Sequence, residues 1–424
     1  MKETPYWWEA APQEAQATIE LPAQADVAII GAGYTGLSAA LTLARAGRQV
    51  LVLESEAPGW GASTRSGGMI GHGHRLSYSG LIAKYGSAKA QSLIREGMAS
   101  LDFVKTLIDA EGLDADLQRT GRVRGAWTDA DYLTMGREAE ALKRDFGLDV
   151  DVLSQSDVRR EVTTQFYKGG LIFHSHGAVH PAKFHRALLH KAHEAGAQVA
   201  AFTRVNSLAP DGQAFQIATS RGTLRARDVL IATNGYTFGL SSALARRLIP
   251  FPSFIIATQE IGTELVQQLI PNGRMIVETR EKHLYYRPSP DGKRIVLGGR
   301  AALHPIPLRN AAQRLRRELV TLFPALANVA ISHCWTGRIA MTKSDLPAIG
   351  RHEGIHYVFG CNGSGVALMP YLGHRAALKI LGKPEGATAF DDVPAPSLPF
   401  YNGRPWFLPL FTLAYRAKDW WRGD

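Results

Sequence analysis

The sequence predicts an α/β fold (α+β overall) with two domains. An apolar run at residues 26–30 stops at the turn Gly31-Ala-Gly-Tyr-Thr-Gly36, and a helix rich in small residues follows. Short segments between 203 and 227, separated by turn residues, are typical of a β-meander. The chain has 424 residues, more than one hydrophobic core usually serves, so a second domain is expected. We therefore predict a Rossmann-like domain with a β-meander, interrupted in sequence by another domain.

The first strand, turn and helix predict a dinucleotide site. Glycines spaced Gly-x-Gly-x-x-Gly at the start of a helix leave backbone N–H groups and the positive end of the helix dipole free for a pyrophosphate. Glu54 ends the next apolar run, where a carboxylate accepts hydrogen bonds from the ribose hydroxyls of an adenosine.

The remaining segments predict the interrupting domain. Helical spacing of apolar residues occurs at 81–110 and 131–146, a further helix is expected at 182–195, and a hairpin joins 284–287 to 294–297. The predicted division of the chain is 1–78, 176–240 and 334–386 for the coenzyme domain, 79–175 and 241–333 for a substrate domain with an antiparallel sheet and flanking helices, and 387–424 for an aromatic C-terminal tail.

Glycine-bearing strand ends recur near Gly235 and Gly363, far from the first turn in sequence. Because the carboxyl ends of parallel strands meet at one edge of a sheet, a single extended ligand explains this recurrence. Flavin adenine dinucleotide (FAD) is long enough to need all of these turns.

Composition excludes several other classes. The formal charge is +10, but the basic residues are scattered, so no nucleic-acid partner is expected. Two cysteines, Cys334 and Cys361, are too few for a disulfide framework, and the histidines lack the spacing of ligands, so no metal is predicted.

The residues at the two ends of the chain indicate where in the cell the protein is expected. The N-terminal residues lack the apolar core of a secretory signal, and we expect a cytoplasmic protein. The tail from Phe400 is aromatic and then basic, and it is too short to span a bilayer. Packing on its own domain and contact with a partner or with the inner face of the membrane are the alternatives for this tail.

Several motifs follow one another along nearly the whole chain. They are Tyr6-Trp-Trp-Glu-Ala, Gly31-Ala-Gly-Tyr-Thr-Gly36, Gly61-Ala-Ser-Thr-Arg-Ser-Gly-Gly68, Ala232-Thr-Asn-Gly-Tyr236, Leu297-Gly-Gly299, Trp335-Thr-Gly337 and Asn362-Gly-Ser-Gly365. In these motifs the chain resembles the FAD-dependent D-amino acid oxidase (DAO) superfamily of amine and amino-acid oxidoreductases, and within it the bacterial γ-glutamylputrescine oxidase type.

The resemblance implies a set of residues around FAD, at the pyrophosphate, the adenosine ribose and the flavin. They are Gly31, Gly33, Tyr34, Thr35, Gly36, Glu54, Ser63, Arg65, Gly67, Gly68, Val205, Thr233, Gly235, Gly363, Ser364 and Gly365.

Aromatic and basic side chains near these motifs are candidates for the substrate pocket, because an aromatic wall excludes water and orients an amine. Arg287 has two readings, since it can bind a carboxylate bidentately or form a surface salt bridge. The candidates are His72, Tyr285, Tyr286, Arg287 and Trp335.

The chain departs from sarcosine-oxidase-like members of the superfamily at two positions. Val296 replaces a lysine that promotes reaction with oxygen, and Cys334 is out of register with the cysteine that attaches flavin. We expect non-covalent FAD, and either oxygen or a quinone-type compound as the electron acceptor.

The sequence thus predicts an FAD-dependent enzyme that oxidises the C–N bond of an amine or an N-substituted amino acid, including γ-glutamylated amines. The alternatives are an amino-acid dehydrogenase that reduces a quinone, an NAD-dependent dehydrogenase, and a non-catalytic flavoprotein at the membrane surface.

Overall fold

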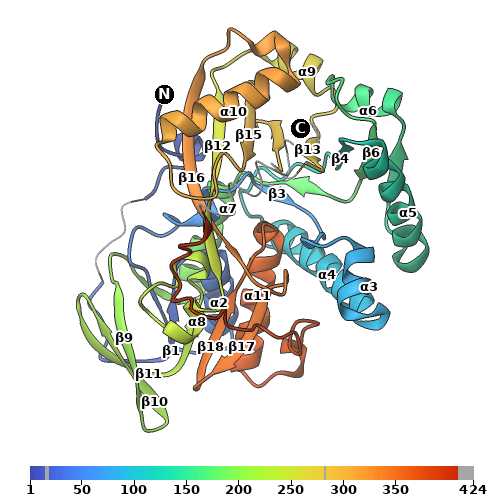
Figure 1. The fold of residues 1–424 in the computed structure, drawn as a ribbon. Coiled ribbons are helices and arrows are strands. Elements are labelled where there is room, and N and C mark those ends of the chain that lie inside the picture. Colours follow the sequence, from blue (N-terminus) through green and yellow to red (C-terminus); the bar gives the residue numbers. More distant parts are fainter. Residues whose placement is uncertain (15–18, 281–282, 409–424) are drawn as a thin grey trace.

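The computed structural model describes residues 1–14, 19–280 and 283–408. Two eight-stranded sheets dominate it, the first in the lower half and the second in the upper half of Figure 1. The path of the first sheet runs β17-β18-β11-β1-β2-β8, with β9 and β10 attached through β11. Its strands are β1 Gln24–Ile30, β2 Val50–Leu53, β8 Gln198–Ala200, β9 Val205–Asp211, β10 Ala214–Thr219, β11 Gly222–Ile231, β17 Ala348–His352 and β18 Ile355–Phe359.

The centre of the first sheet is parallel. Strand β1 pairs in parallel with both β2 and β11, and β11 pairs in parallel with β18. Continuous burial of residues 27–30 and 50–53 is typical of such strands, which are covered on both faces. On one face lie α2 Tyr34–Arg45, α7 Pro181–Glu194 and α11 Gly365–Ile380, with α2 in contact with the other two.

The meander forms as expected, with one difference. The last of the segments predicted between 203 and 227 and the apolar segment that follows it to Ile231 are one strand, β11. Its first half pairs with β10 and its whole length beyond Leu224 pairs with β1. No turn residue separates the two segments, so the strand continues and joins the meander to the parallel sheet.

The second sheet is mostly antiparallel and has the order β16-β12-β15-β14-β13-β4-β6-β5. The predicted hairpin is present as β14 and β15. Its strands are β4 Arg122–Ala126, β5 Val150–Leu153, β6 Gly169–Phe173, β12 Ile249–Thr258, β13 Met275–Glu278, β14 Tyr285–Pro288, β15 Ile295–Gly299 and β16 Ile331–Met341. Strand β16 spans the predicted domain boundary at 334, so the chain returns to the first sheet only after this strand.

Helices cover the second sheet and connect it to the first. Helix α10, Leu308–Leu322, packs on β12, β15 and β16, and α5, Asp129–Phe146, begins with a capping box at Thr128. The segment 81–110 forms two helices, because Gly86 adopts a φ of +80° between them. These helices are α3 Tyr78–Tyr85 and α4 Ser87–Glu111, and α4 packs against α11 of the first sheet.

The shorter elements are α1 Trp7–Ala10, β3 Met69–Ile70, α6 Gln155–Glu161, β7 Gly177–Ala178, α8 Ser242–Ala245 and α9 Thr263–Leu269. Within residues 1–14, 19–280 and 283–408, no helix combines the length and apolar character needed to cross a bilayer. The predicted aromatic tail is described as far as Leu408, and residues 409–424 lie outside the described part of the chain.

Gly36 offers a test of how α2 is held on β1. A Cβ at this position would lie 1.9 Å from the carbonyl oxygen of Gly31. Gly36→Ala is therefore expected to lower the free energy of unfolding by about 1–3 kcal/mol, since the backbone must move. Gly136→Ala in α5, where a Cβ meets nothing within 4 Å, is the control and should raise it by about 0.5–1 kcal/mol. Chemical denaturation compares the two, and wild-type stability of Gly36→Ala would contradict this account.

Buried histidines predict a loss of stability in acid. His185 donates from Nε2 to the carbonyl oxygen of Ala32 at 2.7 Å, and burial lowers the pKa of His185 to about 4. In the unfolded chain a histidine has a pKa near 6.5, so the unfolded state binds the proton first as pH falls. The contribution of His185 is therefore complete above about pH 6.5 and is lost progressively toward pH 4, by at most about 1.4 kcal/mol per pH unit.

His185→Gln, which keeps a donor for Ala32, is expected to flatten the dependence of unfolding free energy on pH between 7 and 5. His190→Gln at an exposed position is the matched control. If the free energy of unfolding of wild type and of His185→Gln depended on pH in the same way, this prediction would be wrong.

Candidate active site

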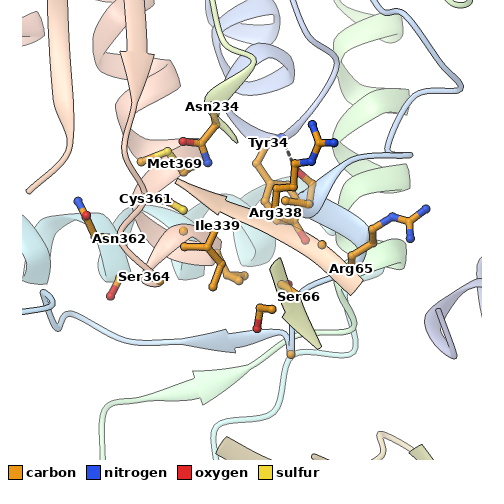
Figure 2. Close-up of a pocket in the computed structure, with 18 of the residues that line it drawn as sticks. Tyr34, Arg65, Ser66, Asn234, Arg338, Ile339, Cys361, Asn362, Ser364 and Met369 are labelled. Carbon is orange, nitrogen blue, oxygen red and sulfur yellow. Dashed lines mark hydrogen bonds between the residues drawn. The ribbon is translucent and has the colours of Figure 1, made fainter. Parts of the chain in front are cut away.

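A cavity of about 950 Å³ lies between the two sheets and is lined from both. Figure 2 shows Asn234, Cys361 and Met369 on one side of it and Tyr34 and Arg65 on the other. These residues come from segments far apart in the sequence. The cavity therefore meets the first requirement of the predicted site, which is that separate turns converge.

The first glycine turn joins β1 to α2 at this cavity. Gly31 has a φ of +105°, which favours glycine, and Gly33 is the N-cap of α2. A Cβ on Gly33 would lie 3.0 Å from Ser63 Oγ, and the Tyr34 N–H donates to the same hydroxyl at 3.0 Å. This helix start can hold a phosphate. Gly36 does not line the cavity and acts through its close packing on Gly31.

Glu54 lies at the end of β2, beside the same turn. Its Oε2 accepts from the Ala32 N–H at 2.9 Å and its Oε1 accepts from the Glu56 N–H at 3.0 Å. Burial raises the pKa of Glu54, and the backbone donors oppose this shift. A carboxylate has lone pairs for further donors, so ribose hydroxyls can bind here. Val205 lines this end of the cavity as well.

The loop at 61–68 runs along the cavity and needs its last two glycines. A Cβ on Gly67 would lie 2.9 Å from Cε2 of Tyr285. Gly68 has a φ of +74°, and a Cβ there would lie 2.2 Å from the carbonyl oxygen of Val179. Backbone at these positions lies against its neighbours with no room for a side chain, which argues against a merely flexible loop.

Arg65 lines the cavity, but its guanidinium is held by the protein. Its Nε donates to the Trp60 carbonyl at 2.7 Å and its Nη1 to the Thr336 carbonyl at 3.2 Å. Its Cζ lies 4.8 Å from the ring centroid of Trp8 and 4.9 Å from that of Trp60. This arginine is therefore fixed in one orientation beside the loop.

The other two glycine turns are joined to each other. Asn234, after β11, accepts from the Gly360 N–H through Oδ1 at 2.9 Å. The segment after β18 lines the cavity with Gly363, Ser364 and Gly365, and α11 starts there. Thr233 lines it too, whereas Gly235 does not, because it packs against Arg338.

The predicted substrate residues separate into two groups. His72 and Tyr285 line the cavity. Tyr286 points to the opposite face of β14, where its hydroxyl lies 2.9 Å from that of Tyr167 in the core beneath α10. Trp335 is fully buried and donates from Nε1 to the Arg65 carbonyl at 2.9 Å.

Arg287 does not line the cavity either. Its Nη1 donates to the Val179 carbonyl at 3.0 Å, its Nη2 to Gln118 Oε1 at 2.7 Å and its Nε to the Pro288 carbonyl at 3.1 Å. The guanidinium is fully buried, and these neutral acceptors use its donors. Arg287 therefore has a structural role. It differs from both roles considered for this residue, which were to bind a substrate carboxylate and to form a surface salt bridge.

The sequence did not single out Arg122 and Arg124, which also line the cavity from β4. The signal was present as Arg-Val-Arg, an alternation typical of a strand with one polar face. Cys361 lines the cavity, while Cys334 is buried on the α10 side of the second sheet, where burial raises the pKa of its thiol to about 12.

The cavity suits FAD in shape and in chemistry. Backbone at the helix start and at the two loop glycines is free of Cβ atoms, and a carboxylate lies beyond the helix start. The cavity extends from Glu54 at one end to the face of the second sheet at the other. An elongated dinucleotide with a flat ring matches this arrangement.

Comparisons with known proteins agree with this fit. A family model described as FAD dependent oxidoreductase (DAO) matches residues 26–378. The chain is 30% identical over 389 residues to the probable oxidoreductase OrdL of Haemophilus influenzae, across 90% of this chain and 88% of that protein. It is 29% identical over 399 residues to the gamma-glutamylputrescine oxidoreductase of Escherichia coli, across 93% and 92%.

A solved structure of glycine oxidase from Geobacillus kaustophilus is similar with a TM-score of 0.75 and 21% identity, and the match covers 90% of this chain and 100% of that one. This likeness confirms the predicted α/β fold. The family match favours FAD over the nicotinamide coenzyme considered as an alternative. The chain belongs to the DAO family of FAD-dependent oxidoreductases.

Proposed function

We propose that this FAD-dependent oxidoreductase oxidises the C–N bond of an amine or an N-substituted amino acid, γ-glutamylated amines included. The bound FAD supplies the hydride acceptor at flavin N5, and water hydrolyses the resulting imine. The observation that carries the proposal is that one face of the second sheet lines the cavity together with the loop at 61–68. The names of two relatives, which specify gamma-glutamylputrescine and glycine, support an amino compound as substrate.

A neutral amine is the form that can release hydride, and His72 is a titratable group that lines the cavity shortly after the loop at 61–68. Burial, with Arg122 as a further cause, lowers the pKa of His72 to about 3, so this imidazole is neutral at pH 7 and adds no charge.

Tyr285 positions the substrate from the sheet side. Its hydroxyl lies 3.2 Å from Ser253 Oγ, and burial raises the pKa of Tyr285 to about 12. The phenol therefore stays protonated at neutral pH and can donate a hydrogen bond. Its ring lies against Gly67 of the loop at 61–68, which we call the coenzyme loop. Tyr285 therefore limits how far a substrate can move from this loop. Orientation of this kind accounts for much of the catalysis expected in such a site.

Gly33→Leu is expected to abolish FAD retention, because a branched side chain at the N-cap of α2 occupies the space of the pyrophosphate and displaces Ser63. The measurement is flavin released from purified protein on denaturation, relative to wild type. Gly136→Ala, remote from the cavity, is the control and should keep its flavin. Full flavin occupancy in Gly33→Leu would contradict the placement of the pyrophosphate.

Anaerobic addition of amines and amino acids is expected to bleach the flavin absorbance of the wild-type protein with at least one compound class. Peroxide formed on readmission of oxygen indicates an oxidase, whereas reduction of a quinone-type dye without peroxide indicates a dehydrogenase. If no compound of a broad panel bleaches the flavin, the proposal fails and the non-catalytic alternative is favoured.

A further inference from the structure

One face of β4 presents two arginines to the cavity. Arg122 and Arg124 are two residues apart, so their side chains lie on the same face of the strand. Val123 between them is fully buried in the core on the other face of the sheet, a core that α10 also joins. The register places Arg122 opposite Met275 and Arg124 opposite Val277 on β13, and Val277 lines the cavity as well.

These two arginines differ from Arg75 and Arg280 of the cavity wall, which have a counter-charge, and from Arg65, whose guanidinium bonds carbonyl oxygens. Neither side chain has a hydrogen bond or an ion pair with any residue that the structure describes, and Arg122 Nε is buried without a partner. By contrast, Arg75 pairs with Asp345 at 2.9 Å and Arg280 with Glu278 at 2.6 Å.

Nearby groups do not supply the missing charge. Burial and the charge of Arg124 lower the pKa of Arg122 to about 10, so it is still cationic at pH 7. Burial and several arginines lower the pKa of His283 to about 4, so this side chain is neutral. Glu138 also lines the cavity, but within the described residues it forms no ion pair with either arginine, and its Oε1 accepts from the Tyr78 N–H at 3.3 Å. An unpaired guanidinium that is partly withdrawn from water is costly, and it is expected where an anion binds.

The register also gives the distance of this charge from the coenzyme loop. Tyr285, whose ring lies against Gly67, is opposite Val277, and Val277 is opposite Arg124. Two strand spacings separate Tyr285 from Arg124, or about 10 Å between backbones. An anionic group bound at Arg124 is therefore several bonds away from a carbon held beside the coenzyme loop.

We propose that Arg122 and Arg124 form a subsite for a carboxylate that the amine substrate carries several bonds from the C–N bond being oxidised. This inference rests on the proposed function for the identity of the substrate, but the binding of the anion does not require turnover. The preferred substrates are amines with a remote carboxylate rather than simple alkylamines. Two guanidinium groups provide the planar pairs of donors that match a carboxylate.

The test compares binding with turnover in the FAD-loaded protein. Pentanoate, which has no amine to oxidise, is titrated by calorimetry, and 5-aminopentanoate and n-pentylamine are compared as substrates. Arg124→Gln is expected to raise the Kd for pentanoate about tenfold to a hundredfold, since a charge-assisted interaction is lost. It should lower kcat/KM for 5-aminopentanoate by a similar factor while that for n-pentylamine stays within about twofold. Arg137→Gln, at an exposed position on α5, is the control and should change neither.

Arg122→Met supplies a second, independent measurement. Arg122 has no hydrogen bond or ion pair among the described residues, and its one ring contact, with Phe173, is long at 5.9 Å from the ring centroid. Its removal should therefore leave the thermal midpoint unchanged or raise it, while pentanoate binding weakens. Unchanged pentanoate binding in both variants would overturn the proposal, as would an equal loss of activity toward both amines. If pentanoate binding depends on the arginines but no amine reduces the flavin, the subsite stands and the proposed function fails.

Discussion

The site depends on backbone that approaches other backbone too closely for any side chain. A Cβ would lie 1.9 Å from the Gly31 carbonyl oxygen at Gly36, and 2.2 Å from the Thr35 carbonyl oxygen at Gly373. The first contact seats α2 on β1, and the second seats α11 on α2. Because α2 is held from both sides, its N-terminus has a fixed position at the end of the sheet. The start of α2 is therefore held in place at the cavity by contacts of the backbone.

Three indoles, two of them fully buried and that of Trp8 partly buried, hold the coenzyme loop against this frame. Trp7 donates from Nε1 to the Ser66 carbonyl at 2.8 Å, Trp8 to Thr64 Oγ1 at 2.9 Å, and Trp335 to the Arg65 carbonyl. A buried indole N–H needs an acceptor, and the loop supplies two carbonyls and a hydroxyl. The N-terminal segment and β16 are distant in sequence, yet both fix this loop. The aromatic residues of these two motifs are thus supports for the loop rather than walls of the substrate pocket.

The coenzyme half of the site could be predicted from the sequence because it requires backbone conformations and close backbone contacts that leave no room for a side chain. Glycine is nearly the only residue that meets them, so its positions at Gly31, Gly33 and Gly68 are informative without knowledge of the tertiary structure. The substrate half depends on which face each strand residue takes. Tyr285 and Tyr286 are adjacent, and alternation sends one to the cavity and the other to the core. Nor could the sequence show that neutral acceptors surround Arg287, because these come from distant segments.

Because side chains on a strand alternate between its two faces, the residues that we expect to select the substrate lie on one face of the second sheet and those that stabilise the sheet lie on the other. On β4 the residue between the two arginines belongs to the core on the far face of the sheet, while the arginines themselves line the cavity. A change at either arginine therefore alters the charge presented to a substrate and leaves the core contact of Val123 in place. Contacts that stabilise the sheet lie on its α10 face, where the hydroxyls of Tyr167 and Tyr286 bond each other and Tyr167 also bonds Glu278. Arginines that form no hydrogen bond or ion pair within the described chain, and that line the cavity on the opposite face, are accounted for by a ligand and not by folding.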